Sequence, residues 1–198
     1  FMEYDVMREK HEYFVKKVNN GVALPVKLAA ISAFTEGLAL FASFIMLLNF
    51  PRHGKMKGMG QIVTWSIVDE TQHAEGVIKL FRTYVEENRE VWNDATKSQI
   101  YSVCTKIVDL EDQFIDLAYS MGPVKGLRES ELKEYIRYIA DRRLISMGMK
   151  GIFKVKKNPL PWVEEMINAP THTNFFENRA TDYAKGALSG SWDEVWAH

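Results

Sequence analysis

Cysteine is almost absent from this chain of 198 residues, which has a single thiol at Cys104. One cysteine excludes a disulfide framework and fits a reducing compartment, so we expect a cytoplasmic protein. An excess of either charge is also lacking, because 25 lysine and arginine residues stand against 26 aspartate and glutamate residues. Without a basic surface the chain has no electrostatic footprint for a polyanion, and we expect no nucleic-acid partner.

The sequence also lacks the short motifs of several enzyme classes. It contains neither a phosphate-binding glycine loop nor a nucleophile elbow, and no repeat of fixed period. No basic segment followed by a cleavage site marks a signal peptide. Because the chain begins at Phe1 rather than at a methionine, we expect a fragment or a processed piece of a longer protein.

Helical periodicity, by contrast, runs through nearly the whole chain, and regular strand alternation is missing, which predicts an all-α protein. The length suits one domain or part of a larger one. Turn residues divide the chain into segments. The expected helices cover about 2–18, Pro25 to Asn49, 57–87, 94–119, 129–147, a short stretch between Pro161 and Pro170, and 174–185.

Long apolar runs are absent except for one, residues 28–50, whose only ionisable side chain is Glu36. The run is long enough to span a bilayer, but a carboxylate lies within it and no other segment is comparably apolar. We therefore expect a buried core helix and no membrane span. A buried, unpaired carboxylate is costly, so Glu36 is expected to meet a metal, another cation or a proton.

The helix expected at 57–87 carries the motif Glu-x-x-His at Glu70 and His73. Residues three apart on a helix emerge on one face about 5–6 Å apart, which suits two ligands of one metal ion. The motif alone equally describes a solvated glutamate beside a core histidine. The inward stripe predicted for the helix at 57–87 consists of Val63, Ser66, Ile67, Glu70, His73, Ala74, Val77, Leu80, Phe81 and Tyr84. The outward face of this helix carries Thr64, Gln72, Glu75, Lys79 and Arg82.

A buried glutamate on one helix and an inward Glu-x-x-His on the next are half the ligand set of a ferritin-like dimetal carboxylate bundle. The neighbours of Glu36 on its own face are mostly small, which leaves room beside the carboxylate: Ala29, Ser32, Ala33, Leu40 and Ser43. These ligand types suit iron, and also manganese or a mixed pair. The cluster Glu36, Glu70 and His73 is thus a candidate metal site.

The remaining ionisable candidates are weaker. Asp69 is either a surface aspartate or a partner that hydrogen-bonds the N–H of a ligating histidine. His11 and His53 lie near charged or loop residues and are expected to face solvent. Cys104 sits on an amphipathic helix and is expected in the core rather than as a nucleophile.

Five segments resemble the small, radical-generating subunit of class I ribonucleotide reductase, in the family's order and over almost the whole chain. They are FTEGLALFASF, KMKGMGQIVTWSIVDETQH, YIADRRLISMG, NPLPWV and TNFFENRATDYAKG. The resemblance implies a ferritin-like bundle over 1–186, of which this chain holds a part, and a tail over 187–198 that docks on the large catalytic subunit. Trp192, Val195 and Trp196 are the expected apolar anchors of that tail.

The resemblance also assigns roles to residues. By it, Glu36, Glu70 and His73 are metal ligands, and Asp69 belongs to a proton-coupled electron-transfer route. Phe44 matches an apolar residue of the pocket that shields the radical. Tyr183 matches the tyrosine that relays the radical to the large subunit.

Two departures from the family pattern matter. Val68 stands where the motif usually has an arginine. The family's first half, with its other ligands and its radical tyrosine, has no match here. We therefore expect that the N-terminal half is a separate polypeptide or is missing, and that the isolated chain is inactive. The resemblance also implies homodimeric assembly. The alternatives are a self-complementing homodimer that binds two metals, and a non-catalytic remnant that binds a partner subunit.

Overall fold

The structure, a computed structural model, describes residues 3–18 and 22–168. These residues are mostly helical and contain no β-strand, which confirms the predicted all-α class. The elements are α1 (Asp5–Glu12), the π-helical η1 (Tyr13–Val18), α2 (Leu24–Ala29), the π-helical η2 (Ala30–Glu36), α3 (Phe41–Arg52), α4 (Lys57–Glu87), a 3-10 turn η3 (Arg89–Val91), α5 (Asp94–Ser120), α6 (Glu129–Ser146) and α7 (Pro161–Asn168).

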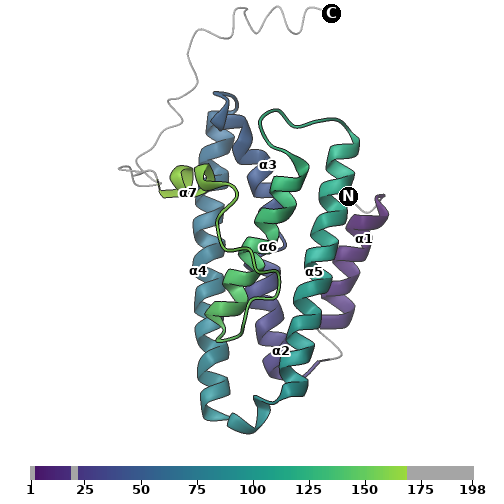
Figure 1. Ribbon diagram of the computed structural model, residues 1–198, viewed down its shortest axis with the longest axis vertical. Coiled ribbons are helices and arrows are strands. Elements are labelled where there is room, and N and C mark those ends of the chain that lie inside the picture. The colour runs from purple at the N-terminus through teal and green to yellow at the C-terminus, as the bar shows by residue number, and fades with distance from the viewer. Residues whose placement is uncertain (1–2, 19–21, 169–198) are drawn as a thin grey trace, which may run out of the picture.

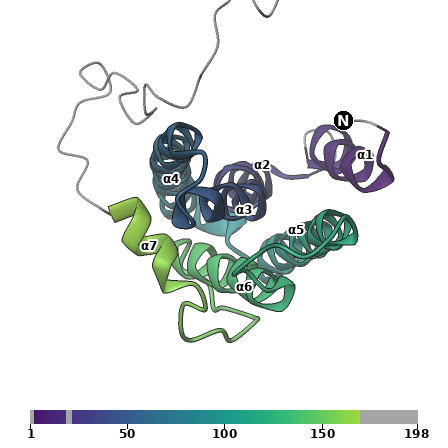
Figure 2. The same cartoon turned by 90° about the horizontal axis from the view of Figure 1, so that it is seen from above.

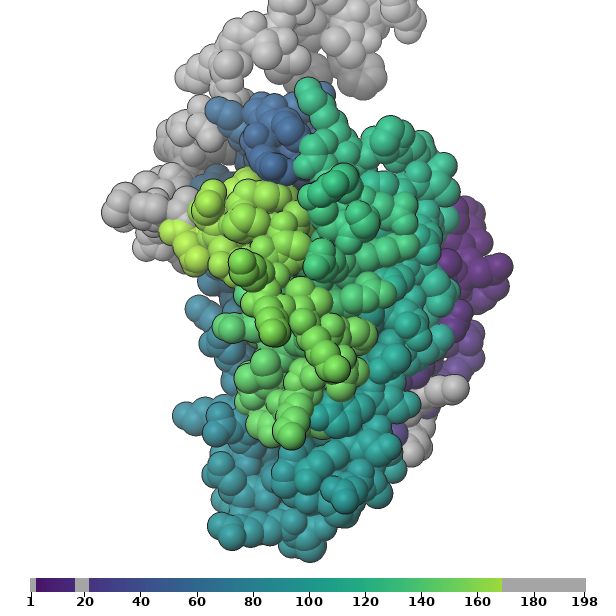
Figure 3. Space-filling view, in the orientation of Figure 1, coloured from purple at the N-terminus to yellow at the C-terminus, as the bar shows by residue number. Residues whose placement is uncertain are grey.

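The helices form two layers (Figures 1 and 2). One layer contains α4 and the continuous stretch α2–η2–α3, which pack along each other, and the second contains α5 and α6. α1 flanks α5 at one edge, and Figure 3 shows α6, α7 and the segment between them covering one face. Because η2 packs against α4, residues at the end of η2 lie opposite the middle of α4.

Local sequence explains where several helices begin. The Asn93 side chain accepts the N–H of Thr96 (3.0 Å) and caps α5. Glu131 accepts the N–H of Arg128 (3.1 Å) at the start of α6. Both helices begin as predicted, at Asp94 and Glu129, and α4 has the predicted bounds 57–87.

The core lies between the two layers and is built from branched and aromatic side chains of every long helix. Cys104 belongs to it, as predicted, and burial raises the pKa of its thiol to about 12. Such a thiol is protonated at neutral pH and is a poor nucleophile. Large side chains that are fully buried include Phe34, Leu38, Ile45, Leu48, Ile67, Phe81, Ile100, Ile107, Ile115, Leu132 and Ile136.

The long apolar run is part of this core. By length and composition the stretch Leu24–Arg52 could cross a membrane, but 56% of its most apolar window is buried inside the molecule. Such burial is typical of a core helix, as predicted. The prediction of one uninterrupted helix from Pro25 to Asn49 is wrong, however, because residues 37–40 separate η2 from α3.

Two further predictions need correction. The inward stripe of α4 was drawn through Leu80 and His73, but Leu80 is 54% exposed and the His73 side chain 63% exposed. Ile78 is buried in addition to Val63, Ile67, Ala74 and Phe81, which belong to the predicted stripe. Within 3–18, the first helix begins only at Asp5 and ends in the π-helical η1. The helix predicted at 174–185 lies outside the described residues.

Candidate metal centre

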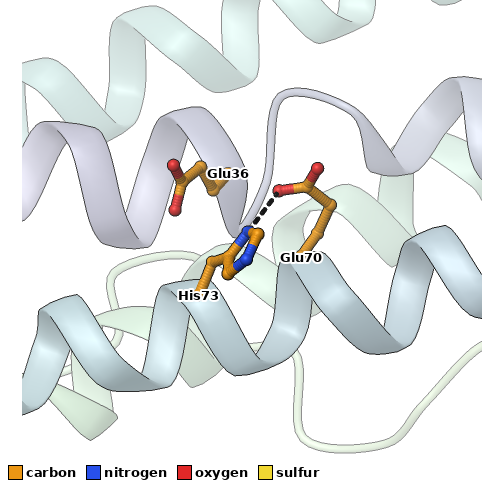
Figure 4. Close-up of side chains that lie close together, drawn as sticks. All are labelled: Glu36, Glu70 and His73. Atoms are coloured by element: carbon orange, nitrogen blue, oxygen red, sulfur yellow. Dashed lines mark ion pairs between the residues drawn. The ribbon is translucent and has the colours of Figure 1, made fainter.

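Glu36, Glu70 and His73 lie together where η2 packs on α4 (Figure 4). Each offers one possible ligand atom, and these atoms lie within 4.8 Å of one another. Glu36 is the last residue of η2, whereas Glu70 and His73 are one turn apart on α4. The fold therefore brings together, from two elements, the three residues singled out by the sequence.

Glu36 takes its direction from π-type hydrogen bonds at the end of η2. The N–H of Gly37 donates to the carbonyl of Ser32 (3.1 Å), and the N–H of Ala39 donates to the carbonyl of Phe34 (2.9 Å). Each bond spans five residues and fits one more residue into the turn than an α-helix holds. Turns of this kind occur frequently at functional sites, because they re-aim a side chain within a continuous helix.

The three side chains differ in exposure. Oε2 of Glu36 is buried and has no hydrogen-bond partner among the described residues. The Glu70 side chain is 26% exposed, and its Oε2 lies 3.7 Å from Nδ1 of His73. A buried polar atom without a partner costs about 1–3 kcal/mol. Glu36 thus lacks the partner that a bound cation supplies.

The donor set fits a transition metal. Carboxylate oxygens and imidazole nitrogen together suit iron or manganese. Two atoms bound to one ion at about 2.1 Å lie at most about 4.2 Å apart. The separations of up to 4.8 Å therefore need to close by roughly half an ångström, which side-chain rotation can supply.

A cavity of about 460 Å³ adjoins the cluster. Met7, Phe14 and Leu40 give it apolar walls, and Lys10 and His11 reach it from α1. His11 is exposed, as predicted, but its place on the cavity wall was not anticipated. The sequence contains no signal for it, because His11 has no helical spacing to Glu36.

The other predicted site residues lie at the margin of the cluster or beyond it. Asp69 is exposed on α4 beside Glu70. Phe44 is half-buried on α3, and its ring packs edge-on against Phe41 with the centroids 6.1 Å apart. The predicted relay residue Tyr183 and the tail anchors Trp192, Val195 and Trp196 fall outside the described residues.

A two-layer helical bundle with carboxylates and a histidine facing one cavity defines the class of ferritin-like helical proteins. The family described as "Ribonucleotide reductase, small chain" matches residues 1–159. The chain belongs to this family.

Individual relatives agree. A protein of Invertebrate iridescent virus 3 named "Probable ribonucleoside-diphosphate reductase small subunit 048L" is 46% identical over 211 residues, covering 97% of this chain and 56% of its own length. A Chlamydia pneumoniae "Ribonucleoside-diphosphate reductase subunit beta" is 38% identical over 148 residues, covering 75% of this chain and 42% of the relative. The chain thus spans about half the length of the curated relatives it matches.

A solved structure shares the fold. The chain superimposes on a ribonucleotide reductase R2 subunit from Clostridium botulinum with a TM-score of 0.72 and 19% identity. The match covers 83% of this chain and 54% of that structure. At this identity the likeness concerns the arrangement of helices alone, and it agrees with the ferritin-like class.

Proposed function

We propose that this chain is the C-terminal part of a ribonucleoside-diphosphate reductase small subunit and contributes Glu36, Glu70 and His73 to a dinuclear metal centre. The observation that carries this proposal is the cluster itself: one carboxylate oxygen of Glu36 lies within 4.8 Å of ligand atoms of Glu70 and His73, and Oε2 of Glu36 is buried without a partner among the described residues. The proposed reaction, the reduction of ribonucleotides by the whole enzyme, is inferred from membership of this family. A bound pair of iron ions, or a manganese or mixed pair, supplies the oxidant that the large subunit uses to make deoxyribonucleotides.

The chain's own residues bind and insulate this centre. Glu36 and Glu70 offer carboxylate oxygens, and His73 offers an imidazole nitrogen. Asp69 and Tyr183 serve radical transfer, and Phe44 contributes an apolar ring to the pocket. These roles rest on the resemblance of the surrounding segments to the family. Apolar walls exclude water from a reactive site, and Met7, Phe14 and Leu40 provide such walls here.

Three ligands do not complete a six-ligand dimetal site, so a second polypeptide segment has to supply the others. The exposure of His73 leaves the open side of the cluster accessible to it. We assign this role to an N-terminal half of the small subunit. The assembly is a cytoplasmic homodimer whose bundle includes residues 1–186 and whose tail, 187–198, binds the large subunit.

Metal analysis with electron paramagnetic resonance tests the proposal, on the chain alone and after addition of the N-terminal half of a close relative. We expect about two metal ions per assembled small subunit and none in the isolated chain. Glu70→Ala should abolish metal binding by the assembly. Gln72→Ala, an exposed change on the same helix, should leave it intact.

Other outcomes overturn specific parts of the proposal. Two metal ions per homodimer of the isolated chain would replace the split site by self-complementation, since two copies supply two carboxylate helices and two Glu-x-x-His motifs. Absence of metal in both samples would leave a non-catalytic module that binds a partner subunit. Unchanged metal content in Glu70→Ala would remove Glu70 from the ligand set.

A further inference from the structure

The break between η2 and α3, residues 37–40, comes directly after Glu36, and its first three residues are buried whereas Leu40 is exposed. Gly37, Leu38 and Ala39 have little or no exposed surface. The N–H groups of Gly37, Ala39 and Phe41 donate to carbonyls of the preceding turn. A buried carbonyl also needs a donor, and side chains of other helices donate to the carbonyls of Gly37 and Ala39.

Arg143 on α6 contacts the first carbonyl of the break. Its Nε donates to the oxygen of Gly37 (3.1 Å), and its guanidinium lies over the ring of Phe41, 5.9 Å from the centroid. Burial lowers the pKa of Arg143. A Cβ atom on residue 37 would lie 2.8 Å from this Nε, so the approach of Arg143 requires glycine there.

Lys10 on α1 contacts a second carbonyl of the break, that of Ala39. Its Nζ donates to the oxygen of Ala39 (2.6 Å) and pairs with Glu111 of α5, whose side chain is completely buried. The other carboxylate oxygen of Glu111, Oε2, is buried and has no hydrogen-bond partner among the described residues. The ion pair with Lys10 thus connects the buried Glu111 of α5 to the Ala39 carbonyl of the break.

We propose that Lys10, Glu111 and Arg143 form a clamp that holds the break and thereby positions the Glu36 carboxylate opposite Glu70 and His73. The three side chains come from three different helices: Arg143 and Lys10 donate to the carbonyls of Gly37 and Ala39, and Glu111 holds Lys10 in place. In its consequence for metal binding, the inference rests on the function proposed above.

Charged residues are an expensive way to hold a core together. A buried ion pair is often no more stabilising than apolar residues of the same volume, although removing one partner is costly. The clamp charges instead fix one backbone geometry, because each bond has a defined acceptor or donor. If the π-type turn relaxed to an α-helix, the residues on its two sides would rotate relative to each other by about 100°. Glu36 would then turn away from the other ligands.

The test compares clamp variants with matched controls in the assembled protein. The clamp variants are Lys10→Met, Glu111→Gln, Arg143→Met and Arg143→Lys. The controls break ion pairs of the same helices away from the break: Lys106→Met loses Glu9 (2.6 Å) between α5 and α1, and Lys133→Met loses Asp116 between α6 and α5.

Three readouts separate positioning from general stability: amide hydrogen exchange of residues 36–42 in the metal-free protein, the visible spectrum and affinity of bound Co²⁺, and the free energy of unfolding. We expect the clamp variants to exchange at least about tenfold faster at 36–42, to bind Co²⁺ about 10–100-fold more weakly, and to change its spectrum. Arg143→Lys should recover part of each effect. The controls should lower stability alone.

Wild-type exchange at 36–42 and a wild-type Co²⁺ spectrum in Glu111→Gln and Arg143→Lys would overturn the clamp, whatever happens to stability. These two variants decide the matter if the methionine variants fail to fold. Failure of the proposed function looks different, since the wild type would then bind no Co²⁺. In that case hydrogen exchange in the metal-free protein still decides whether the clamp holds the break.

Discussion

Nδ1 of His73 lies 3.7 Å from Oε2 of Glu70, one turn away on α4, and both side chains face the end of η2 (Figure 4). At this distance the two groups form at most a weak ion pair when the histidine is protonated. Glu36 lies beside this pair and completes a group of three possible metal ligands. Because Glu36 brings a second carboxylate to the same place, the cluster concentrates negative charge where a cation can bind.

Replacing His73 by alanine should remove a ligand with little effect on folding, because the side chain is 63% exposed. Since changes that only orient a ligand cost 10–100-fold in metal affinity, loss of the ligand itself should weaken Co²⁺ binding by more than about 100-fold. Equilibrium titration followed by visible absorption measures this. Glu75→Ala, exposed on the same helix, is the control. Equal affinities of the two variants would exclude His73 as a ligand.

Replacing Glu36 by glutamine should have opposite effects on stability and on metal binding. In the metal-free protein the change removes a negative charge beside Glu70, at a place where Oε2 of Glu36 is buried without a partner among the described residues, so the free energy of unfolding should rise by about 1 kcal/mol. Metal affinity should fall at the same time. Urea denaturation in the presence of a chelator measures the first effect, and Glu87→Gln, on the exposed end of α4, should change it by less than about 0.5 kcal/mol. A destabilised Glu36→Gln protein would show that the carboxylate is already satisfied.

The sequence is sufficient to single out the three residues of the candidate metal site and to predict most helix bounds. A carboxylate within an apolar run identified Glu36, and helical spacing identified Glu70 and His73. Local signals of this kind act over one or two turns, and the helical periodicity that follows the turn at Gly54 accordingly predicts α4 with its full length.

Tertiary contacts explain what the sequence did not predict. Gly37 is a local signal of the break after Glu36, but the side chains that hold the break, Lys10, Glu111 and Arg143, lie on other helices and have no local pattern within the apolar run. The burial of Ile78 rather than Leu80 likewise depends on how α4 is rotated against its neighbours.

The buried Glu111 should make stability depend on pH. Burial raises the pKa of its carboxyl group from 4.5 to about 7. Lys10 and the Ala42 N–H oppose this rise, and the charge on Asp112 adds to it. Between pH 4.5 and about pH 7 the folded protein therefore binds more protons than the unfolded chain. Its free energy of unfolding should fall as pH rises through this window, by up to about 3 kcal/mol.

Urea denaturation of the metal-free protein at pH 4.5 and 7.5 measures this slope. In Glu111→Gln the contribution should disappear, so the variant should lose less stability than the wild type as pH rises. Glu9→Gln, which removes a half-exposed carboxylate paired with Lys106, is the matched control. Parallel pH profiles for wild type and Glu111→Gln would contradict the assignment.

Two glycine-to-alanine changes should have opposite effects. A Cβ at position 37 would lie 2.6 Å from the oxygen of Ala33 and 2.8 Å from Nε of Arg143, whereas a Cβ at position 76 of α4 meets no atom within 4 Å. Gly37 has φ −82° and ψ −9°, which alanine adopts freely, so only the close contacts oppose the change. Gly37→Ala should cost about 1–3 kcal/mol and weaken Co²⁺ binding, because it displaces Arg143 from the residue next to Glu36.

Gly76→Ala should add about 0.5–1 kcal/mol of helix stability and leave metal binding unchanged. If Gly37→Ala proved as stable as Gly76→Ala, the packing of Arg143 against the break would be looser than these distances require.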